Sequence, residues 1–220
     1  MKTVTPYKII LADDHILLRD ALANLITEST EFTIIAKAAN GNEVINAIQE
    51  NGQPDILLMD LNMPEMDGYE TAKEVAIHYP QIRIVILSMH DTELALARLL
   101  QIGVDGFLKK DIHPDELKKA LLDIGAGRPY YSYGAAIKIA DLLRKKINSN
   151  LSLEDLLLSE QEIEFLKLAS TSMSYSEIAN AMHLTISHME SYRKSLFAKL
   201  QVDSRVGLAI YAIQNGIINV

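Results

Sequence analysis

The chain has 220 residues, 49% of them hydrophobic and 23% charged, which is typical of a folded globular protein and excludes an intrinsically disordered one. The absence of cysteine excludes disulfides and thiolate metal sites. The net charge of −8 gives no global sign of nucleic-acid binding. The apolar stretch near the N-terminus is too short for a secretory signal, and no run reaches the about 18 residues of a membrane span. We therefore expect a cytoplasmic protein without a membrane anchor.

Residues 1–127 alternate between two periodicities. Short apolar, β-branched runs fall at residues 7–12, 32–38, 55–60, 83–88 and 106–109. Between these runs, apolar residues recur every three or four positions, as they do on one face of a helix. Strands that alternate with helices indicate βαβ units and a parallel sheet covered on both faces. The sequence therefore predicts an α/β domain with a five-stranded, doubly wound parallel sheet.

The remainder of the chain has no strand pattern. Residues 128–150 begin with Gly, Pro and Tyr residues and continue into a basic helical stretch, so we expect a linker with helical content. Residues 151–220 are predicted to form an all-α domain of four short helices. Ser159 with Glu162 and Ser174 with Glu177 have the spacing of capping boxes, Thr185 can cap a third helix, and Asp203 or Ser204 can cap a fourth.

Charged and polar residues stand where the predicted strands of the α/β domain end. In strand order these residues are Asp13 and Asp14, then Asp60, Ser88, and Lys109 or Lys110. Because ligand sites in open parallel sheets form beyond the carboxyl ends of the strands, we expect these side chains to gather at one edge. Three clustered carboxylates repel one another, and Mg²⁺ bound by their oxygens relieves that repulsion. With Mg²⁺ present, the carboxylate of Asp60 can attack a phosphoryl group while a lysine balances the developing charge.

Any one of these acids alone is more simply explained as a helix cap or a solvated turn residue. The argument for a site rests on the combination of acids, hydroxyl and ammonium on the correct successive strands.

The motifs "ADDH", "MDLNMPEMDG", "LSMHD" and "GFLKKD" closely resemble the receiver domain of two-component response regulators over about residues 6–126. The resemblance implies that Asp60 accepts phosphate from a sensor histidine kinase. It implies that Asp14, Asp60 and the backbone carbonyl of Asn62 bind Mg²⁺, with Asp13 contributing through water. Ser88 would hydrogen-bond the phosphoryl group, and the lysine three residues after Phe107, which is Lys110, would pair with it. Ser88 and Phe107 would move together as the switch.

The C-terminal helices resemble the LuxR-type (NarL/FixJ class) helix-turn-helix. The matching residues are Ser176 to Ala179, Leu196, Lys199-Leu200, Val202, Ser204 to Val206 and Gly216-Ile217. The helical wheel of residues 186–200 places Met189, Tyr192, Leu196 and Leu200 on one inner face. A polar face suited to the major groove remains. The candidate DNA-binding residues on or beside this helix are Ser187, His188, Glu190, Ser191, Arg193, Lys194, Lys199 and Arg205, of which the four cations are predicted phosphate contacts.

These features favour a phosphorylation-switched transcription regulator that binds promoter DNA as a homodimer and is not an enzyme. A second hypothesis keeps the receiver but makes the output protein–protein interaction. That hypothesis arises because Glu190 stands where family members usually carry lysine, and because Tyr192 replaces a common histidine. A third hypothesis, a phosphatase of the haloacid dehalogenase type, ranks low because Asn62 occupies the position where that class requires a second aspartate.

Overall fold

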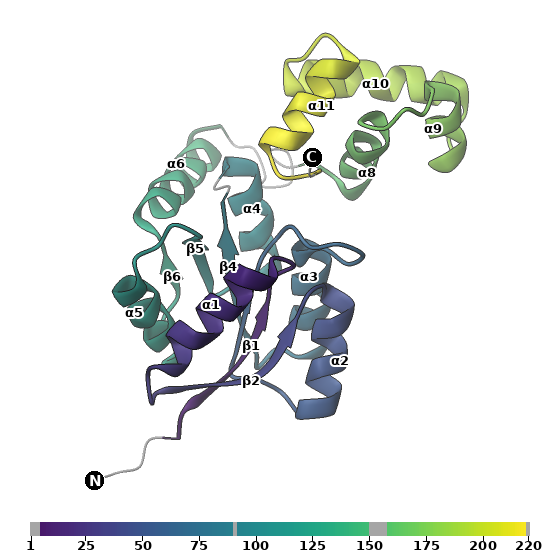
Figure 1. Cartoon of the computed structure of the whole chain (residues 1–220). Helices are drawn as coiled ribbons and strands as arrows, with labels where there is room; N and C mark the ends of the chain where they lie inside the picture. The colour runs from purple at the N-terminus through teal and green to yellow at the C-terminus, as the bar shows by residue number, and fades with distance from the viewer. Residues whose placement is uncertain (1–4, 90–91, 150–157, 219–220) are drawn as a thin grey trace. The chain divides into compact units, whose positions relative to one another are not determined.

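The computed structural model describes residues 5–89, 92–149 and 158–218 (Figure 1). The chain divides into two units. Apart from Thr92–Ala95, which are grouped with the second unit, the division falls inside helix α6 (Tyr133–Ser149), between Ala140 and Asp141. Within the described part of the chain, no helix has both the length and the apolar character needed to cross a bilayer.

The first unit is built on a parallel β-sheet. Its main strands are β1 (Tyr7–Ala12), β2 (Phe32–Ala38), β3 (Ile56–Met59), β4 (Arg83–Ser88) and β5 (Gly106–Lys109). The strand order is β2-β1-β3-β4-β5-β6, with parallel pairing throughout. The five predicted strands are therefore confirmed. The order places β1 beside β3, β3 beside β4 and β4 beside β5, so the residues that follow these strands share one edge of the sheet.

Helices cover both faces of this sheet (Figure 1). They are α1 (Ile16–Thr27), α2 (Gly41–Asn51), α3 (Gly68–His78), α4 (Glu93–Ile102) and α5 (Pro114–Gly125). Apolar residues of α1 and α5 pack into one cluster with alternate residues of the strands, among them Ile9, Leu58, Val85 and Leu108. Helices α2, α3 and α4 lie on the opposite face. Burial on both faces explains why the strands are almost continuously apolar.

A sixth strand, β6 (Tyr130–Tyr131), corrects the prediction of five. These residues lie in the segment predicted as linker, yet they pair in parallel with β5. The backbone N–H of Tyr130 donates to the carbonyl of Asp105 at 3.0 Å, and the N–H of Ser132 donates to the carbonyl of Phe107 at 3.0 Å. Two residues are too few to show a periodicity, so the pattern could not identify this strand.

The loop that joins β3 to α3 closes tightly on itself. The N–H of Gly68 donates to the carbonyl of Leu61 at 2.8 Å. A Cβ atom at Gly68 would lie 2.4 Å from the carbonyl oxygen of Asp60 and 2.6 Å from the Cα of Leu61. Asp67 caps the following helix by accepting hydrogen bonds from the first two N–H groups after Gly68. Only glycine therefore allows the start of α3 to approach the end of β3 so closely.

The second unit consists of short helices with side-chain caps. They are α8 (Glu160–Ala169), α9 (Tyr175–Ala181), α10 (Ile186–Leu200) and α11 (Arg205–Gln214). Both predicted capping boxes are present, Thr185 caps α10, and Ser204 caps α11. Met189 and Leu196 are buried as predicted, whereas Tyr192 and Leu200 are only partly buried.

We expect Gly68→Ala to lower the free energy of unfolding of the α/β unit by about 1–3 kcal/mol, because the added methyl group meets backbone atoms that cannot move aside. Urea unfolding followed by circular dichroism measures this change. Gly134→Ala, at an exposed position of α6, is the matched control and should leave stability unchanged or slightly raised. Equal stabilities for the two variants would contradict the close approach at Gly68.

Candidate functional site

The predicted side chains meet at the carboxyl edge of the sheet. Asp13 follows β1, Asp60 follows β3, Ser88 ends β4 and Lys110 follows β5. The Nζ atom of Lys110 lies 2.8 Å from Asp13 Oδ2 and 2.8 Å from Asp60 Oδ2. Asp13, Asp60 and Ser88 are each at most 3% exposed, so this ammonium–carboxylate bridge is buried. The structure therefore brings the predicted nucleophile, acid and lysine into direct contact.

Backbone hydrogen bonds between neighbouring strand ends fix these residues in place. The N–H of Asp60 donates to the carbonyl of Ala12 at 2.9 Å, and the N–H of Lys110 donates to the carbonyl of Ser88 at 3.0 Å. The N–H of Leu61 also donates to Asp60 Oδ1 at 2.8 Å. One carboxylate oxygen of Asp60 thus binds the backbone and the other binds Lys110, which sets the orientation of the carboxylate.

Two residues that were not predicted as part of the site hold the loop after β1. His15 Nδ1 lies 2.8 Å from Asp14 Oδ1 and 3.2 Å from Asp13 Oδ1. The guanidinium of Arg19 donates to the carbonyl of Asp13 at 2.6 Å and to that of Ala38 at 3.3 Å. The signal for His15 was its position directly after the acid pair. Arg19 gave no such signal, because its partners are backbone carbonyls at the ends of two different strands, β1 and β2.

Burial and charge act in opposite directions on the ionisable groups of the bridge. Desolvation raises the pKa of the Asp60 carboxyl above its ordinary value, although the hydrogen bond and charge of Lys110 oppose that change. Desolvation alone would lower the pKa of Lys110, but the hydrogen bonds and charges of Asp13 and Asp60 outweigh it and raise the pKa. The lysine is therefore a firmly held cation beside a carboxylate that is costly to keep charged.

The donor set at this edge fits a divalent cation. Ligand atoms of Asp13, Asp14, His15 and Asp60 all lie within 4.8 Å of one another. Asp13 Oδ2 is buried, and the Lys110 ammonium is the cation that faces it, at 2.8 Å. Carboxylate oxygens are the donors that Mg²⁺ prefers. Asn62, the predicted backbone ligand, is partly buried in the loop directly after Asp60.

The two residues of the predicted switch are buried. Ser88 is 1% exposed at the end of β4, and Phe107 is fully buried in β5. In the sheet register Phe107 lies opposite Ile86, two residues before Ser88 on β4. The aromatic ring therefore occupies an inward position, two residues along the neighbouring strand from the hydroxyl group.

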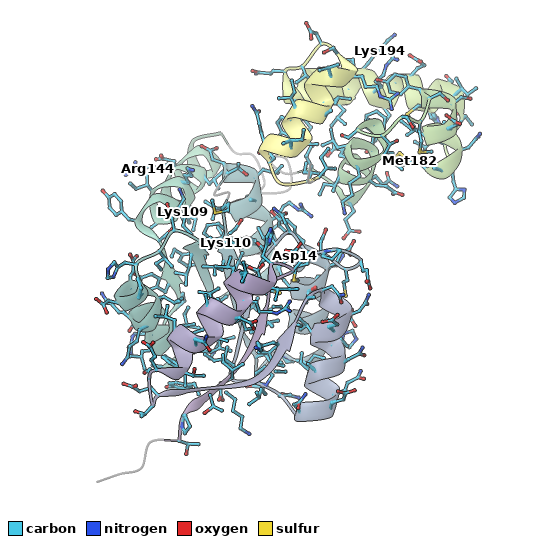
Figure 2. The ribbon with its side chains drawn as sticks, in the orientation of Figure 1. Asp14, Lys109, Lys110, Arg144, Met182 and Lys194 are labelled. Carbon is cyan, nitrogen blue, oxygen red and sulfur yellow. The ribbon has the colours of Figure 1, made fainter. Side chains whose placement is uncertain are left out.

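The predicted DNA-binding residues lie on or beside α10, but their environments differ. Ser187, His188, Ser191 and Lys194 are exposed on α10. Lys194, labelled in Figure 2, makes no ion pair, hydrogen bond or ring contact with the described residues. Arg193 is paired with Glu190 at 2.8 Å. The sequence therefore located the helix, but whether each charged side chain is available to contact DNA depends on its neighbours in the structure.

The remaining two predicted phosphate contacts bind other helices of the same unit. Lys199 forms an ion pair with Glu162 of α8 at 2.8 Å. Arg205 donates to the carbonyls of Ala169 and Thr171, 2.8 and 2.7 Å away, at the end of α8. Tyr192 packs edge-on against Phe165 of α8, with the ring centroids 5.6 Å apart, which gives this substitution for histidine a packing role.

We expect Lys110→Met to lower the free energy of unfolding of the α/β unit in EDTA by about 3–5 kcal/mol, because it leaves buried carboxylates without their cation. Excess MgCl2 should recover more stability in this variant than in the unchanged chain, since the lysine no longer competes for the carboxylates. Urea unfolding in both buffers provides the measurement. Lys118→Met is the control, because Lys118 pairs with Glu31 at the surface, where such a pair contributes at most about 1 kcal/mol. If Mg²⁺ raised the stability of Lys110→Met and Lys118→Met by equal amounts, the competition between Lys110 and Mg²⁺ for the carboxylates would be contradicted.

Two known families match separate parts of the chain. Residues 9–122 match the response regulator receiver domain, and residues 156–212 match the luxR family of bacterial regulatory proteins. The response regulator protein VraR of Staphylococcus aureus is 28% identical over 211 residues, which cover 96% of this chain and 98% of VraR.

Among solved structures, a LuxR-family two-component response regulator from Aurantimonas sp. SI85-9A1 is 31% identical, with a TM-score of 0.58, covering 62% of this chain and 96% of that one. RcsB from Salmonella enterica serovar Typhimurium, solved bound to the promoter rprA with a phosphomimetic, shares the fold with a TM-score of 0.60 at 23% identity. That match covers 94% of this chain and 98% of RcsB. With its receiver domain at residues 9–122 and its luxR-family domain at 156–212, the chain belongs to the LuxR-type two-component response regulators.

Proposed function

We propose that the chain is a transcription regulator switched by phosphorylation of Asp60. The observation that carries the proposal is the buried Asp60 carboxylate, which Lys110 bridges to Asp13 at the carboxyl edge of the sheet. A carboxylate of raised pKa that is held beside an ammonium group and a buried hydroxyl is arranged for chemistry, because a purely structural core would exclude such charges.

The phosphoryl donor in this proposal is a phosphohistidine of a sensor histidine kinase. A carboxylate oxygen of Asp60 forms a bond to phosphorus as the phosphorus–nitrogen bond breaks, and the bonding electrons leave with the imidazole. Lys110 and the Ser88 hydroxyl stabilise the charge on the phosphoryl oxygens. Mg²⁺ held by Asp13, Asp14, Asp60 and the Asn62 carbonyl would supply further neutralisation of that charge. The chain accepts the phosphoryl group and takes part in its loss, but it turns over no separate substrate.

The output of the switch is binding of promoter DNA through α10. Phosphate at Asp60 biases the receiver between two states, with Ser88 and Phe107 as the residues that move. The exposed polar face of α10 supports this output, as do Lys194, which has no ion-pair partner among the described residues, and the promoter-bound structure of RcsB.

A homodimer is the expected DNA-binding form. Helix α11 carries an exposed apolar stripe at the helical spacing i, i+4, i+7, formed by Val206, Ile210 and Ile213. Such a stripe in two copies can pair around a two-fold axis and present two recognition helices to two half-sites.

A protein–protein output is the second candidate. It is favoured by the engagement of Arg193, Lys199 and Arg205 with groups of their own domain, which leaves few free cations for phosphate contacts. The two candidates differ in whether any duplex DNA is retained.

We expect Asp60→Asn to abolish labelling of the chain by radioactive acetyl phosphate, since the amide lacks the nucleophilic oxygen of the carboxylate. Asp55→Asn, at the opposite end of β3, is the matched control and should be labelled as well as the unchanged chain. Persistent labelling of Asp60→Asn at one mole per mole would show that another residue is the nucleophile.

We expect acetyl phosphate to increase the affinity of the chain for its DNA, and Lys194→Ala to weaken that affinity on every sequence tested. Removal of one phosphate contact should also reduce the slope of log affinity against log salt by about one. Fluorescence anisotropy at several salt concentrations measures both effects. Lys118→Ala, on α5, removes the same charge and should leave the slope unchanged. A loss confined to one sequence would instead make Lys194 a base-reading residue.

A further inference from the structure

The polar face of α10 contains one acidic side chain among hydroxyl and ammonium groups. Glu190 lies beside Ser187, Ser191 and Lys194 on the helical wheel, and its side chain is 46% exposed. We propose that Glu190 is a specificity-determining residue that selects a cytosine in the major groove of each DNA half-site. This inference rests on the proposed function of DNA binding and deepens it.

Arg193, three residues further along α10, fixes the carboxylate of Glu190. Its Nη2 atom donates to Glu190 Oε2 at 2.8 Å. The guanidinium lies 4.6 Å from the centroid of the Tyr175 ring and 5.9 Å from that of Phe197, and its Nε atom is buried. Arg193 is therefore held by α9 and by its own helix, so that it acts as a support for Glu190 more readily than as a mobile phosphate contact.

The Tyr175 ring is itself held in the domain core. It stacks on Phe165 of α8 with an interplanar angle of 10° and a centroid separation of 6.3 Å. Phe165 is fully buried. A continuous set of contacts thus runs from the core through Tyr175 and Arg193 to Glu190. These contacts order the side chain of Glu190 before any DNA is bound.

This arrangement leaves one acceptor of Glu190 available. Oε2 binds Arg193, whereas Oε1 accepts no hydrogen bond from the described residues. The positive charge of Arg193 also offsets the charge of the carboxylate, which reduces its repulsion from DNA phosphates. The chain therefore presents an oriented hydrogen-bond acceptor on its DNA-facing helix without presenting an uncompensated anion.

The chemistry of the base edges decides which partner suits that acceptor. In the major groove, only the amino groups of cytosine and adenine donate hydrogen bonds. The adenine amino group stands beside the N7 acceptor, which repels a carboxylate, whereas cytosine N4 has no such neighbour. A glutamate acceptor therefore favours cytosine. A glutamine at the same position would favour adenine, because it can donate to N7 and accept from N6 at once.

Selection of binding sites from random duplex DNA tests the inference. The full-length chain is treated with acetyl phosphate and compared with Glu190→Gln and Glu190→Ala. The unchanged chain should enrich a motif with one fixed cytosine in each half-site, and replacing that base pair should weaken binding about tenfold, as expected for one base-edge contact. Glu190→Gln should shift the preference at that position to adenine, and Glu190→Ala should remove it.

Glu164→Gln is the matched control, because it removes an equal charge from an exposed position of α8 and should leave the enriched motif unchanged. If Glu190 only stabilises α10 through its pair with Arg193, all four proteins will enrich the same motif, and the inference is overturned while the proposed function stands. If the unchanged chain retains no duplex, the proposed function fails and the inference fails with it.

Discussion

The contact on which the receiver depends is the buried bridge from the Lys110 ammonium to Asp13 and Asp60, at 2.8 Å each. Carboxylates that are almost inaccessible to water would repel one another and resist ionisation without a cation between them. The order β1-β3-β4-β5 brings the ends of four strands together and so makes the bridge possible. The same contact that allows the acids to be buried also places a positive charge where a phosphoryl group would arrive.

Most of the receiver could be predicted because its determinants are periodic. The apolar runs mark the strands, and parallel topology brings the residues that follow them to one edge, so Asp13, Asp60, Ser88 and Lys110 could be located together. The short strand β6 could not be predicted, because two residues carry no period. The contacts of His15 and Arg19 were also missed, since they depend on how a turn folds back on itself rather than on any spacing.

The DNA-binding domain shows a different boundary between what is predictable and what is not. The serine and glutamate pairs at Ser159 and Ser174 predicted two helix starts, because capping is a local interaction between residues three apart. The partners of the cations could not be predicted in this way. Arg205 and Lys199 have long side chains that reach a carbonyl and a carboxylate on α8, more than 30 residues away in the sequence.

The close approach of Gly68 to Asp60 has a consequence for the rate of the phosphoryl transfer proposed at Asp60. The Asp60 carboxylate lies in a loop that is closed by a backbone hydrogen bond and leaves no room for a Cβ atom at Gly68, and its two oxygens are held by the N–H of Leu61 and by Lys110. In the proposed transfer it would therefore have little rotational freedom to lose when a donor arrives. The entropy of aligning the attacking oxygen is lost once, when the chain folds, and not again in each encounter. A glycine packed against the backbone of the proposed phosphate acceptor would thereby lower an activation barrier.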